Sequence, residues 1–197
     1  MIRPIFLFGA EVLDKPSEPI TNISGAEIQL VKDMVETMYK ASGVGLAAPQ
    51  VGVGKRLMVT DPTAGEKTGQ IITIVNPEII ATEGEQYEEE GCLSVPGFSA
   101  AVVRPKKVVL QGLDLNGKEI TVEGTDLLAR AFCHEMDHLN GVFFLDHLSF
   151  IKRDMFGRVL GLVHSRPTVS TDTGAASIRN EPIPEGTPGN FQVEPNK

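Results

Sequence analysis

Two histidines four residues apart, in His134-Glu-Met-Asp-His138, constrain the fold of this chain more than any other feature of the sequence. On a helix, side chains at this spacing lie on one face with Cβ atoms about 5–6 Å apart, so both imidazoles can bind one metal ion. Glu135 lies one position round from His134, where its carboxylate can reach a water on the metal without binding the metal itself. The pattern therefore predicts a helix that carries two metal ligands and an acid/base.

The helix around this segment is predicted to run from about residue 125 to residue 140, with Gly141 after its last turn. An exposed helix on which the HExxH pattern is accidental is the alternative interpretation. The apolar positions favour a buried helix, and a buried face with two histidines and a glutamate needs a partner such as a metal ion. These apolar residues are Leu127, Leu128, Ala131, Phe132 and Leu139.

A catalytic metal site usually takes three ligands from the protein and leaves one position open, so a third ligand is needed. One group of HExxH proteases uses a later histidine, but this chain has Phe144 at that position. Another group uses a later glutamate, of which there is none before the proline-rich C-terminal segment, while Asp146 and Asp154 remain candidates. Cys92, in Glu90-Gly-Cys92-Leu-Ser94, is by itself either a small core residue or a ligand. Together with the two histidines it completes a Cys/His/His catalytic set.

Cys133 is rotated about 100° from the ligand face of its helix, and we assign it to packing.

Composition narrows the classes of protein further. Two cysteines are too few for a disulfide framework, which favours a reducing, cytoplasmic location. A formal net charge of −8 argues against sequence-independent binding to the phosphates of nucleic acid, and no apolar run is long enough to span a membrane. We therefore expect neither a membrane nor a sequence-specific nucleic acid as a partner.

The glycine-rich segment Gly43-Val-Gly45-Leu-Ala-Ala48 matches the GxGxxA fingerprint of dinucleotide-binding proteins only superficially. That fingerprint requires a strand before it and a helix after it, whereas here a helix precedes it and Pro49 follows. Two interpretations remain. The segment is a plain helix-terminating turn, or it is a loop whose glycines let the backbone lie against an extended substrate while Gln50 directs its amide toward the reacting centre.

Local signals predict several further elements. Ser24-Gly-Ala-Glu27 has capping-box spacing, and apolar residues then recur at helical intervals up to Gly43. Short strands are predicted at residues 56–60 and 71–75, each ended by a proline-containing segment. Asn116-Gly117 predicts a type I′ turn between strands at 108–115 and 119–122, because that turn needs positive φ at both positions.

A third helix is predicted from residue 149 to about residue 164, and Lys152, Arg153 and Arg158 make it locally basic. Beyond Ser165 the chain is rich in Pro, Gly, Ser and Thr, which predicts a flexible tail. We expect a catalytic domain at residues 1–164 and the tail at residues 165–197. The expected fold class is α+β, with antiparallel β-sheets packed around a central metal-binding helix, a C-terminal helix and the tail.

Three segments in this order, GVGLAAPQ at 43–50, EGCLS at 90–94 and HEMDH at 134–138, resemble the motifs of the peptide deformylase family. The similarity extends from the N-terminus to about His164. It implies a cytoplasmic, metal-dependent hydrolase that removes the formyl group from the N-terminal formylmethionine of new polypeptides and releases formate. Fe(2+) is implied as the native metal, although Cys and His donors also suit Zn(2+) and other divalent transition metals. Where the family often has glutamine before HExxH, this chain has Cys133.

The resemblance also implies roles for individual residues. A metal-bound water attacks the formyl carbon with Glu135 as general base and then acid, and the oxyanion meets the Leu93 backbone N–H and the Gln50 amide. Val44 and Leu93 are expected to form walls of the methionine pocket, and the Gly45 backbone is expected to pair with the peptide. Arg104 binds either a nearby carboxylate such as Glu90 or the substrate.

Three alternatives remain open at this point. Related enzymes dock near the ribosomal exit through their C-terminal segment, which is expected here unless the basic face of the third helix is simply solvated. A zinc endopeptidase would cut inside peptides rather than release formate. A metal-stabilised binding module would need a fourth protein ligand, for which the sequence offers no clear residue.

Overall fold

The computed structural model describes residues 1–67 and 69–159, with side chains to residue 154. In this part of the chain an antiparallel sheet has the strand order β1-β2-β3-β6-β7, and β4 pairs with β5 in a separate two-stranded sheet. The strands are β1 (Gly45–Ala47), β2 (Leu57–Thr60), β3 (Ile72–Glu83), β4 (Gln86–Cys92), β5 (Val95–Arg104), β6 (Lys107–Leu113) and β7 (Glu119–Thr125). The helices are α1 (Gly25–Lys40), α2 (Asp126–Leu139) and α3 (Phe150–Val159), with short 3₁₀ helices η1 (Glu11–Leu13), η2 (Ala48–Val51) and η3 (Phe144–His147).

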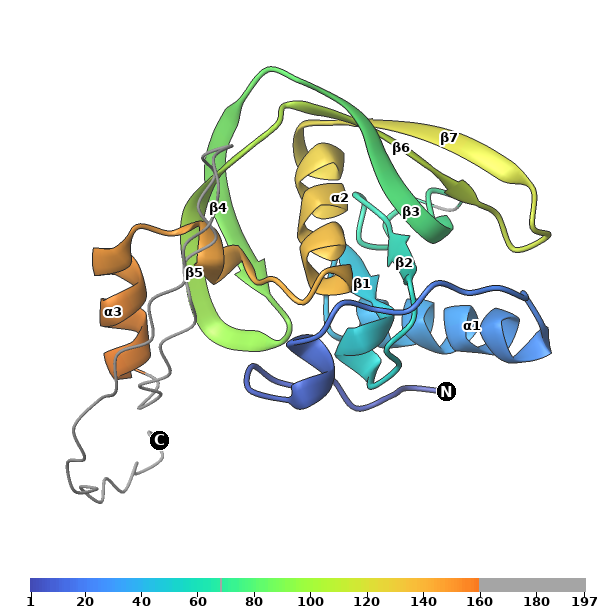
Figure 1. Cartoon of the computed structure of the whole chain (residues 1–197), viewed down its shortest axis with the longest axis horizontal. Helices are drawn as coiled ribbons and strands as arrows, with labels where there is room; N and C mark the ends of the chain where they lie inside the picture. Colours follow the sequence, from blue (N-terminus) through green and yellow to red (C-terminus); the bar gives the residue numbers. More distant parts are fainter. Residues whose placement is uncertain (68, 160–197) are drawn as a thin grey trace, which may run out of the picture. The chain divides into compact units, whose positions relative to one another are not determined.

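Helix α2 lies in the middle of this arrangement and contacts strands of both sheets (Figure 1). Three buried clusters surround it. One joins α1 to β1 and β2, the second joins α2 to the five-stranded sheet, and the third joins β4, β5 and η3 to the N-terminal segment. This is the α+β architecture with antiparallel sheets around a central helix that the sequence predicts.

Both long helices begin and end close to the predicted residues. The predicted capping box is present at α1, where Ser24 and Glu27 exchange hydrogen bonds between side chain and backbone. Helix α2 has Thr125 as its N-cap and Asn140 as its C-cap, and Gly141 follows with a φ of 72°. The HExxH segment is therefore helical throughout, as its spacing requires.

The prediction that a strand ends at Asn76-Pro77 is wrong. Strand β3 continues to Glu83, and its pairing with β6 shifts register between Val75 and Glu78. Asn76 adopts a φ of 50°, so that Asn76 and Pro77 together form a bulge in the ladder. Proline is tolerated at a bulge because no ladder hydrogen bond is required from its nitrogen.

The turn between β6 and β7 is also different from the predicted type I′ turn. Gly117 has a φ of 77°, whereas Asn116 is not among the residues with positive φ. The Gly117 amide donates to the Asp114 carbonyl at 3.0 Å, and the Asp114 amide donates to the Lys118 carbonyl at 2.8 Å. The Asp114 carboxylate also accepts from the backbone amides of Asn116 and Lys118, which favours this three-residue loop over the two-residue turn.

Strands β4 and β5 were not predicted from the sequence. Successive glutamates in β4 and small residues in β5 give neither strand a clear alternation of apolar and polar residues. Cys92 pairs with Val95, so Leu93 and Ser94 form a tight turn between the two strands. This turn brings Cys92 to the end of β4, beside helix α2.

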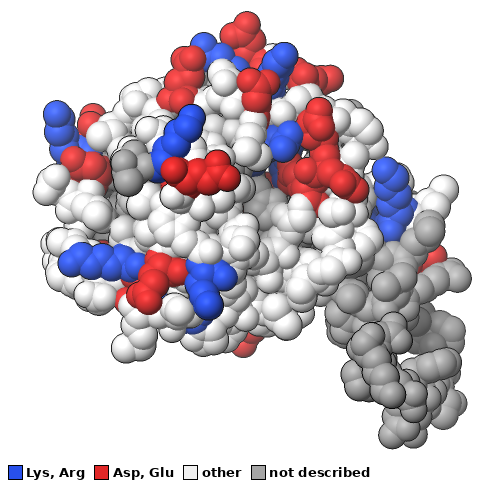
Figure 2. All heavy atoms as spheres, turned by 180° about the vertical axis from the view of Figure 1, so that it is seen from behind, with Lys and Arg blue, Asp and Glu red and all other residues white. Residues whose placement is uncertain are grey.

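Helix α3 begins near the predicted residue, and the predicted continuation from 160 to 164 and the tail at 165–197 lie outside the described residues. Within the described part of the chain no helix is both long enough and apolar enough to cross a bilayer. On the face that Figure 2 shows, Lys and Arg side chains lie beside Asp and Glu side chains in separate groups, with uncharged surface between the groups.

Candidate metal centre and active site

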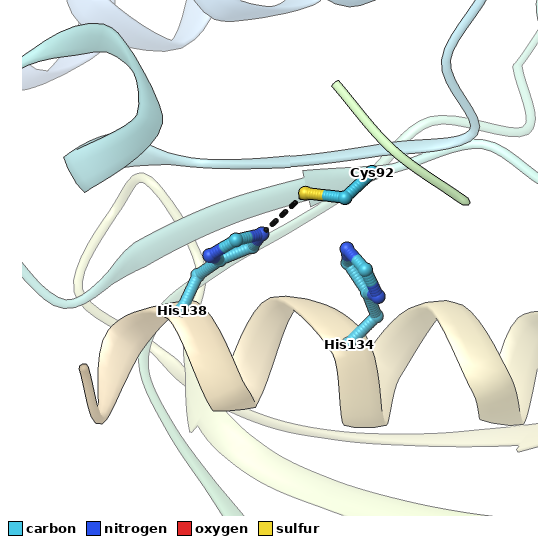
Figure 3. A group of neighbouring side chains, drawn as sticks. All are labelled: Cys92, His134 and His138. Atoms are coloured by element: carbon cyan, nitrogen blue, oxygen red, sulfur yellow. Dashed lines mark hydrogen bonds between the residues drawn. The ribbon is translucent and has the colours of Figure 1, made fainter. Parts of the chain in front are cut away.

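Cys92, His134 and His138 converge on one point. Their candidate ligand atoms all lie within 4.8 Å of one another, and Cys92 Sγ lies 3.1 Å from His138 Nε2. The two imidazoles project from one face of α2 toward the thiol at the end of β4 (Figure 3). Residues separated by more than forty positions in the sequence therefore form one ligand group.

Aromatic side chains fix the two imidazole rings. The ring centroids of His134 and His138 are 5.0 Å apart. The His134 ring stacks on Phe144 with a centroid distance of 6.0 Å, and the His138 ring meets the edge of Phe143 at 5.3 Å. Phe144, which occupies the position of the third histidine in one protease group, thus orients a candidate ligand instead of supplying one.

Glu90 connects the ligand group to a buried ion-pair network. His134 Nδ1 lies 3.1 Å from Glu90 Oε2, and the Arg104 guanidinium donates two hydrogen bonds to Glu90 at 2.8 and 3.0 Å. Arg104 also lies 2.8 Å from an Asp137 oxygen. The alternatives left open for Arg104 are thereby decided in favour of the carboxylate, because both of its Glu90 contacts are buried.

The protonation state of Glu90 follows from these contacts. Burial raises the pKa of this carboxyl group, but the hydrogen bonds with His134 and Arg104 outweigh burial and lower the pKa to about 2. An ionised Glu90 accepts from the His134 Nδ1–H and leaves Nε2 free to bind a metal ion. The sequence alone did not indicate this role for Glu90. Its position two residues before Cys92, on the same face of a strand, is the signal that was available.

Glu135 lies beside the ligand group with 3% of its surface exposed. Burial raises the pKa of its carboxyl group to about 7. Its Oε2 atom has no hydrogen-bond partner among the described residues. A Cβ atom added at Gly45 would lie 2.3 Å from Glu135 Oε1, so glycine at this position makes room for the carboxylate. A carboxyl group with a pKa near neutrality therefore lies against the same cavity as His134 and Cys92.

Gln50 lies on η2 and contacts the end of β4 and the turn that follows it. Its side chain is 1% exposed, and its Oε1 atom accepts from the Ala47 backbone N–H at 2.9 Å. Its Nε2 atom lies 3.2 Å from Ser94 Oγ and 3.8 Å from Cys92 Sγ. The predicted glycine loop is thus β1 followed by a 3₁₀ helix, and it brings the Gln50 amide beside Cys92.

A cavity of about 520 Å³ opens beside the ligand group. Val44, Gly45 and Leu93, the residues predicted to contact substrate, all line it together with His134 and Glu135. Other lining residues, which were not predicted from the sequence, come from the first turns of α2 and from the β4–β5 turn region. These include Leu127, Arg130, Ala131, Pro96 and Phe98.

Two other predictions concern residues outside the ligand group. Cys133 is buried in the cluster between α2 and the five-stranded sheet, in agreement with its assignment to packing. Asp146 accepts from the Phe143 backbone N–H at 2.9 Å at the start of η3. Neither Asp146 nor Asp154 belongs to the group that the described ligand atoms form.

The donor set suits a divalent transition metal, because a soft sulfur and two imidazole nitrogens are the usual ligands of such ions. The unpartnered Glu135 Oε2 also fits a site that is completed by an ion and its water. A metal-binding group with three ligands, a carboxyl group beside it and an adjoining cavity defines the chain as a metal-dependent hydrolase.

The sequence family agrees with this class. Residues 2–154 match the family model described as polypeptide deformylase. The chain is 52% identical over 146 residues to a peptide deformylase of Thermodesulfovibrio yellowstonii, with 74% of this chain and 88% of that protein covered. It is 49% identical over 155 residues to a peptide deformylase of Acidobacterium capsulatum, which covers 79% of this chain and 91% of the relative. The chain belongs to the polypeptide deformylase family.

Solved structures agree with the fold. A peptide deformylase from Legionella pneumophila superposes with a TM-score of 0.74 at 45% identity, over 82% of this chain and 98% of the other. A peptide deformylase from Ehrlichia chaffeensis in complex with actinonin superposes with a TM-score of 0.74 at 38% identity, over 83% and 99% of the two chains.

Proposed function

We propose that this chain hydrolyses the formyl group of N-terminal formylmethionine in new polypeptides, with a metal ion held by Cys92, His134 and His138 and with Glu135 as acid/base. The observation that carries the proposal is the convergence of the thiol and two imidazoles beside a buried carboxyl group. A bound divalent ion would act as a Lewis acid and lower the pKa of a coordinated water from about 15.7 toward about 7.

The residues around this ion would divide the reaction between them. Glu135 accepts the proton of the attacking water, since its pKa near 7 suits proton transfer in both directions at neutral pH. The Gln50 amide and the Leu93 backbone N–H donate to the oxyanion that forms on the formyl carbonyl. Glu135 then delivers its proton to the leaving amine, which becomes the free N-terminus of the peptide.

Substrate binding is proposed to use the cavity and the edge of β1. Val44 and Leu93 line the cavity and would form walls around the methionine side chain. Strand β1 pairs with β2 along one side, and its Gly45 backbone would pair with the peptide along the other. The extended peptide would then leave the formyl group next to Glu135.

We propose Fe(2+) as the native metal, with Zn(2+) or another divalent transition metal in protein purified in air. The ligand set supports this range without choosing within it, because sulfur and imidazole bind several of these ions. Two free thiols support a reducing, cytoplasmic location, where new polypeptides are made.

Docking to the ribosome through the C-terminal helix is part of the proposal. Lys152 lies against the ring of Tyr87, with Nζ 6.0 Å from the ring centroid, and Arg153 follows it on α3. Reversing both charges, as Lys152→Glu and Arg153→Glu, should reduce the fraction that sediments with ribosomes. Unchanged sedimentation of the double variant would rule out this mode of docking.

The proposed domain organisation assigns catalysis to residues 1–164 and leaves 165–197 as a separate tail. The family match at residues 2–154 supports the first part of this division. A chain shortened after residue 164 should keep the kcat and KM of the full chain. A large loss of kcat on truncation would assign the tail to the catalytic unit.

The decisive experiment is an assay of formate release from a formyl-Met-Ala-Ser peptide by anaerobically purified protein, with metal analysis on the same sample. The proposal expects formate, one divalent ion per chain and no cleavage of internal peptide bonds. Internal cleavage would identify an endopeptidase. Bound metal without any turnover would favour a metal-stabilised binding module.

A further inference from the structure

Ser94 contacts Gln50 inside the protein, although the two residues belong to segments far apart in the sequence. Gln50 lies on η2, and Ser94 lies in the turn between β4 and β5. Gln50 Nε2 donates to Ser94 Oγ at 3.2 Å, and the two side chains are 1% and 0% exposed. Ser94 is not among the residues that line the cavity, so it has no direct route to the substrate.

The orientation of the Gln50 amide is fixed from both ends. Its Oε1 atom accepts from the Ala47 backbone N–H at 2.9 Å, so Nε2 must point toward Ser94 and Cys92. A flipped amide would turn its NH₂ group toward the Ala47 N–H and lose that hydrogen bond, so the Ala47 N–H decides the orientation, since the Ser94 hydroxyl can either accept or donate. The Nε2 atom carries two hydrogens. One is donated to Ser94 at 3.2 Å, and the other points into the site, where its nearest acceptor is Cys92 Sγ at the longer distance of 3.8 Å.

The backbones of the two segments are held together by one stretch of the N-terminal region. The Phe6 amide donates to the Gln50 carbonyl at 2.8 Å, and the Phe8 amide donates to the Ser94 carbonyl at 2.8 Å. The Phe8 ring packs on Phe143, with centroids 4.9 Å apart. The separation of Gln50 and Ser94 is therefore set by main-chain hydrogen bonds, which lets one side-chain contact define the direction of the amide.

We propose that Ser94 is a positioning residue for the reaction. Its hydroxyl oxygen takes one hydrogen of the Gln50 amide and thereby directs the other hydrogen at the oxyanion. The inference rests on the proposed function, in which the Gln50 amide stabilises that oxyanion. Ser94 acts through Gln50, so its contribution disappears when Gln50 has no amide to hold.

A double-mutant cycle tests this dependence. Formate release from formyl-Met-Ala-Ser is measured for the parent holoenzyme, Ser94→Ala, Gln50→Ala and the double variant, together with the metal content of each. Ser94→Ala should lower kcat about 3- to 10-fold, the effect of one ordinary hydrogen bond, with KM within about 2-fold of the parent. In the Gln50→Ala background the same change should lower kcat less than about 2-fold. Metal content should be equal in all four proteins.

Ser17 provides the matched control, because its hydroxyl is also buried but has no partner among the described residues. Ser17→Ala should leave kcat unchanged. An equal loss for Ser94→Ala in both backgrounds would overturn the inference, and so would a loss of metal from Ser94→Ala. If the parent itself releases no formate, the proposed function fails rather than this inference.

A measurement on the parent does not depend on any variant folding. The side-chain amide of Gln50 in the metal-loaded, isotope-labelled protein should exchange its hydrogens with water far more slowly than the exposed side chain of Gln70. Slow exchange supports a held amide. Equally rapid exchange at both positions would overturn the proposed role of Ser94.

Discussion

Glu135 combines nearly complete burial with a pKa raised to about 7 by that burial, and its Oε2 atom lacks a partner within the described part of the chain. Glu135→Gln keeps the shape of the side chain but removes proton transfer. We expect this variant to retain one metal ion per chain and to lose turnover by about 100- to 10,000-fold. Metal analysis and formate release on the same sample measure both effects. Glu119→Gln, which alters an exposed carboxylate on β7, is the control and should behave as the parent.

Normal formate release by Glu135→Gln would remove Glu135 from the mechanism. Loss of metal from this variant would instead assign Glu135 to the ligand set.

Gly45 tests how closely the backbone of β1 must approach this carboxyl group. A methyl group here would lie 2.3 Å from Glu135 Oε1, so the carboxylate or the strand would have to shift. Gly45→Ala should therefore lower kcat/KM at least about tenfold while the metal content stays the same, because small misplacements of a catalytic group are costly. In Gly54→Ala the added atom would lie 3.9 Å from the nearest side chain, so activity should be unchanged. Equal activities of the two variants would contradict the proposed contact.

Arg104 joins three elements, since it lies on β5 and binds Glu90 on β4 and Asp137 on α2. Arg104→Met leaves the Glu90 carboxylate buried without the guanidinium that donates two hydrogen bonds to it. The free energy of unfolding should fall by about 3–5 kcal/mol, the usual effect of breaking a buried pair from one side. Urea denaturation measures this. The matched control is Lys107→Met, which removes an exposed pair with Glu123 and should change stability little. Similar losses in both variants would contradict the argument.

Tyr39 links α1 to the loop after β2. Burial raises the pKa of its phenol to about 12, and the hydrogen bond that it donates to Asp61 at 2.7 Å contributes as well. A raised pKa means that the folded state favours the neutral phenol, so this contribution to stability is complete below about pH 10 and is lost as the pH rises through about 12. The variant Tyr87→Phe leaves Tyr39 as the one tyrosine of the chain. After a rapid jump to pH 11, the folded variant should give less than half of the phenolate absorbance that the same variant gives when it is unfolded in guanidinium chloride at pH 11. Full absorbance in protein that is still folded would contradict this.

Elements whose signals are local could be predicted from the sequence, and elements fixed by distant partners could not. The capping box of α1 and the HExxH spacing of α2 depend on residues within one or two turns, and both predictions are confirmed. Strands β4 and β5 have no clear alternation of apolar and polar residues. They are fixed by pairing with each other and by the contacts of β5 with η3 and α2, all of which come from other parts of the chain. The bulge at Asn76-Pro77 escaped prediction for a related reason, since the pairing with β6 carries the strand past the proline.

In the candidate site, too, residues with local signals could be predicted and residues fixed by distant partners could not. The two histidines could be selected because a buried helix face that carries them needs a partner such as a metal ion, and Cys92 could be selected because that ion needs a third protein ligand. The sequence predicted Glu90 only as a possible partner of Arg104 and assigned no role to Ser94. Their contacts with His134 and Gln50 come from segments more than forty residues away, so only the folded chain brings them together.

At the scale of the whole molecule, the metal ion would add a further connection between parts of the protein that the ion pairs of Arg104 with Glu90 and Asp137 also join. Cys92 belongs to the cluster of β4, β5 and η3, whereas α2 packs mainly in the cluster against the five-stranded sheet. An ion that is bound by Cys92 and by the two histidines of α2 stabilises the folded state relative to the unfolded chain. At a free concentration about 1,000 times Kd this amounts to about 4 kcal/mol, which corresponds to about 8–16 °C in Tm for a chain of this size.

Removal of the metal ion by a chelator should therefore lower the Tm by about this amount while the far-ultraviolet circular dichroism at 25 °C stays native, because the three clusters remain packed without it. Differential scanning calorimetry on the same sample before chelation, after chelation and after Fe(2+) is added back measures the change. Cys92→Ala is the control, since its Tm should not respond to chelator or metal once one of the three ligands is missing. If chelation unfolds the parent at 25 °C, the clusters do not hold the fold by themselves. If Cys92→Ala responds as strongly as the parent, the stabilising ion is bound elsewhere and the proposed ligand set is wrong.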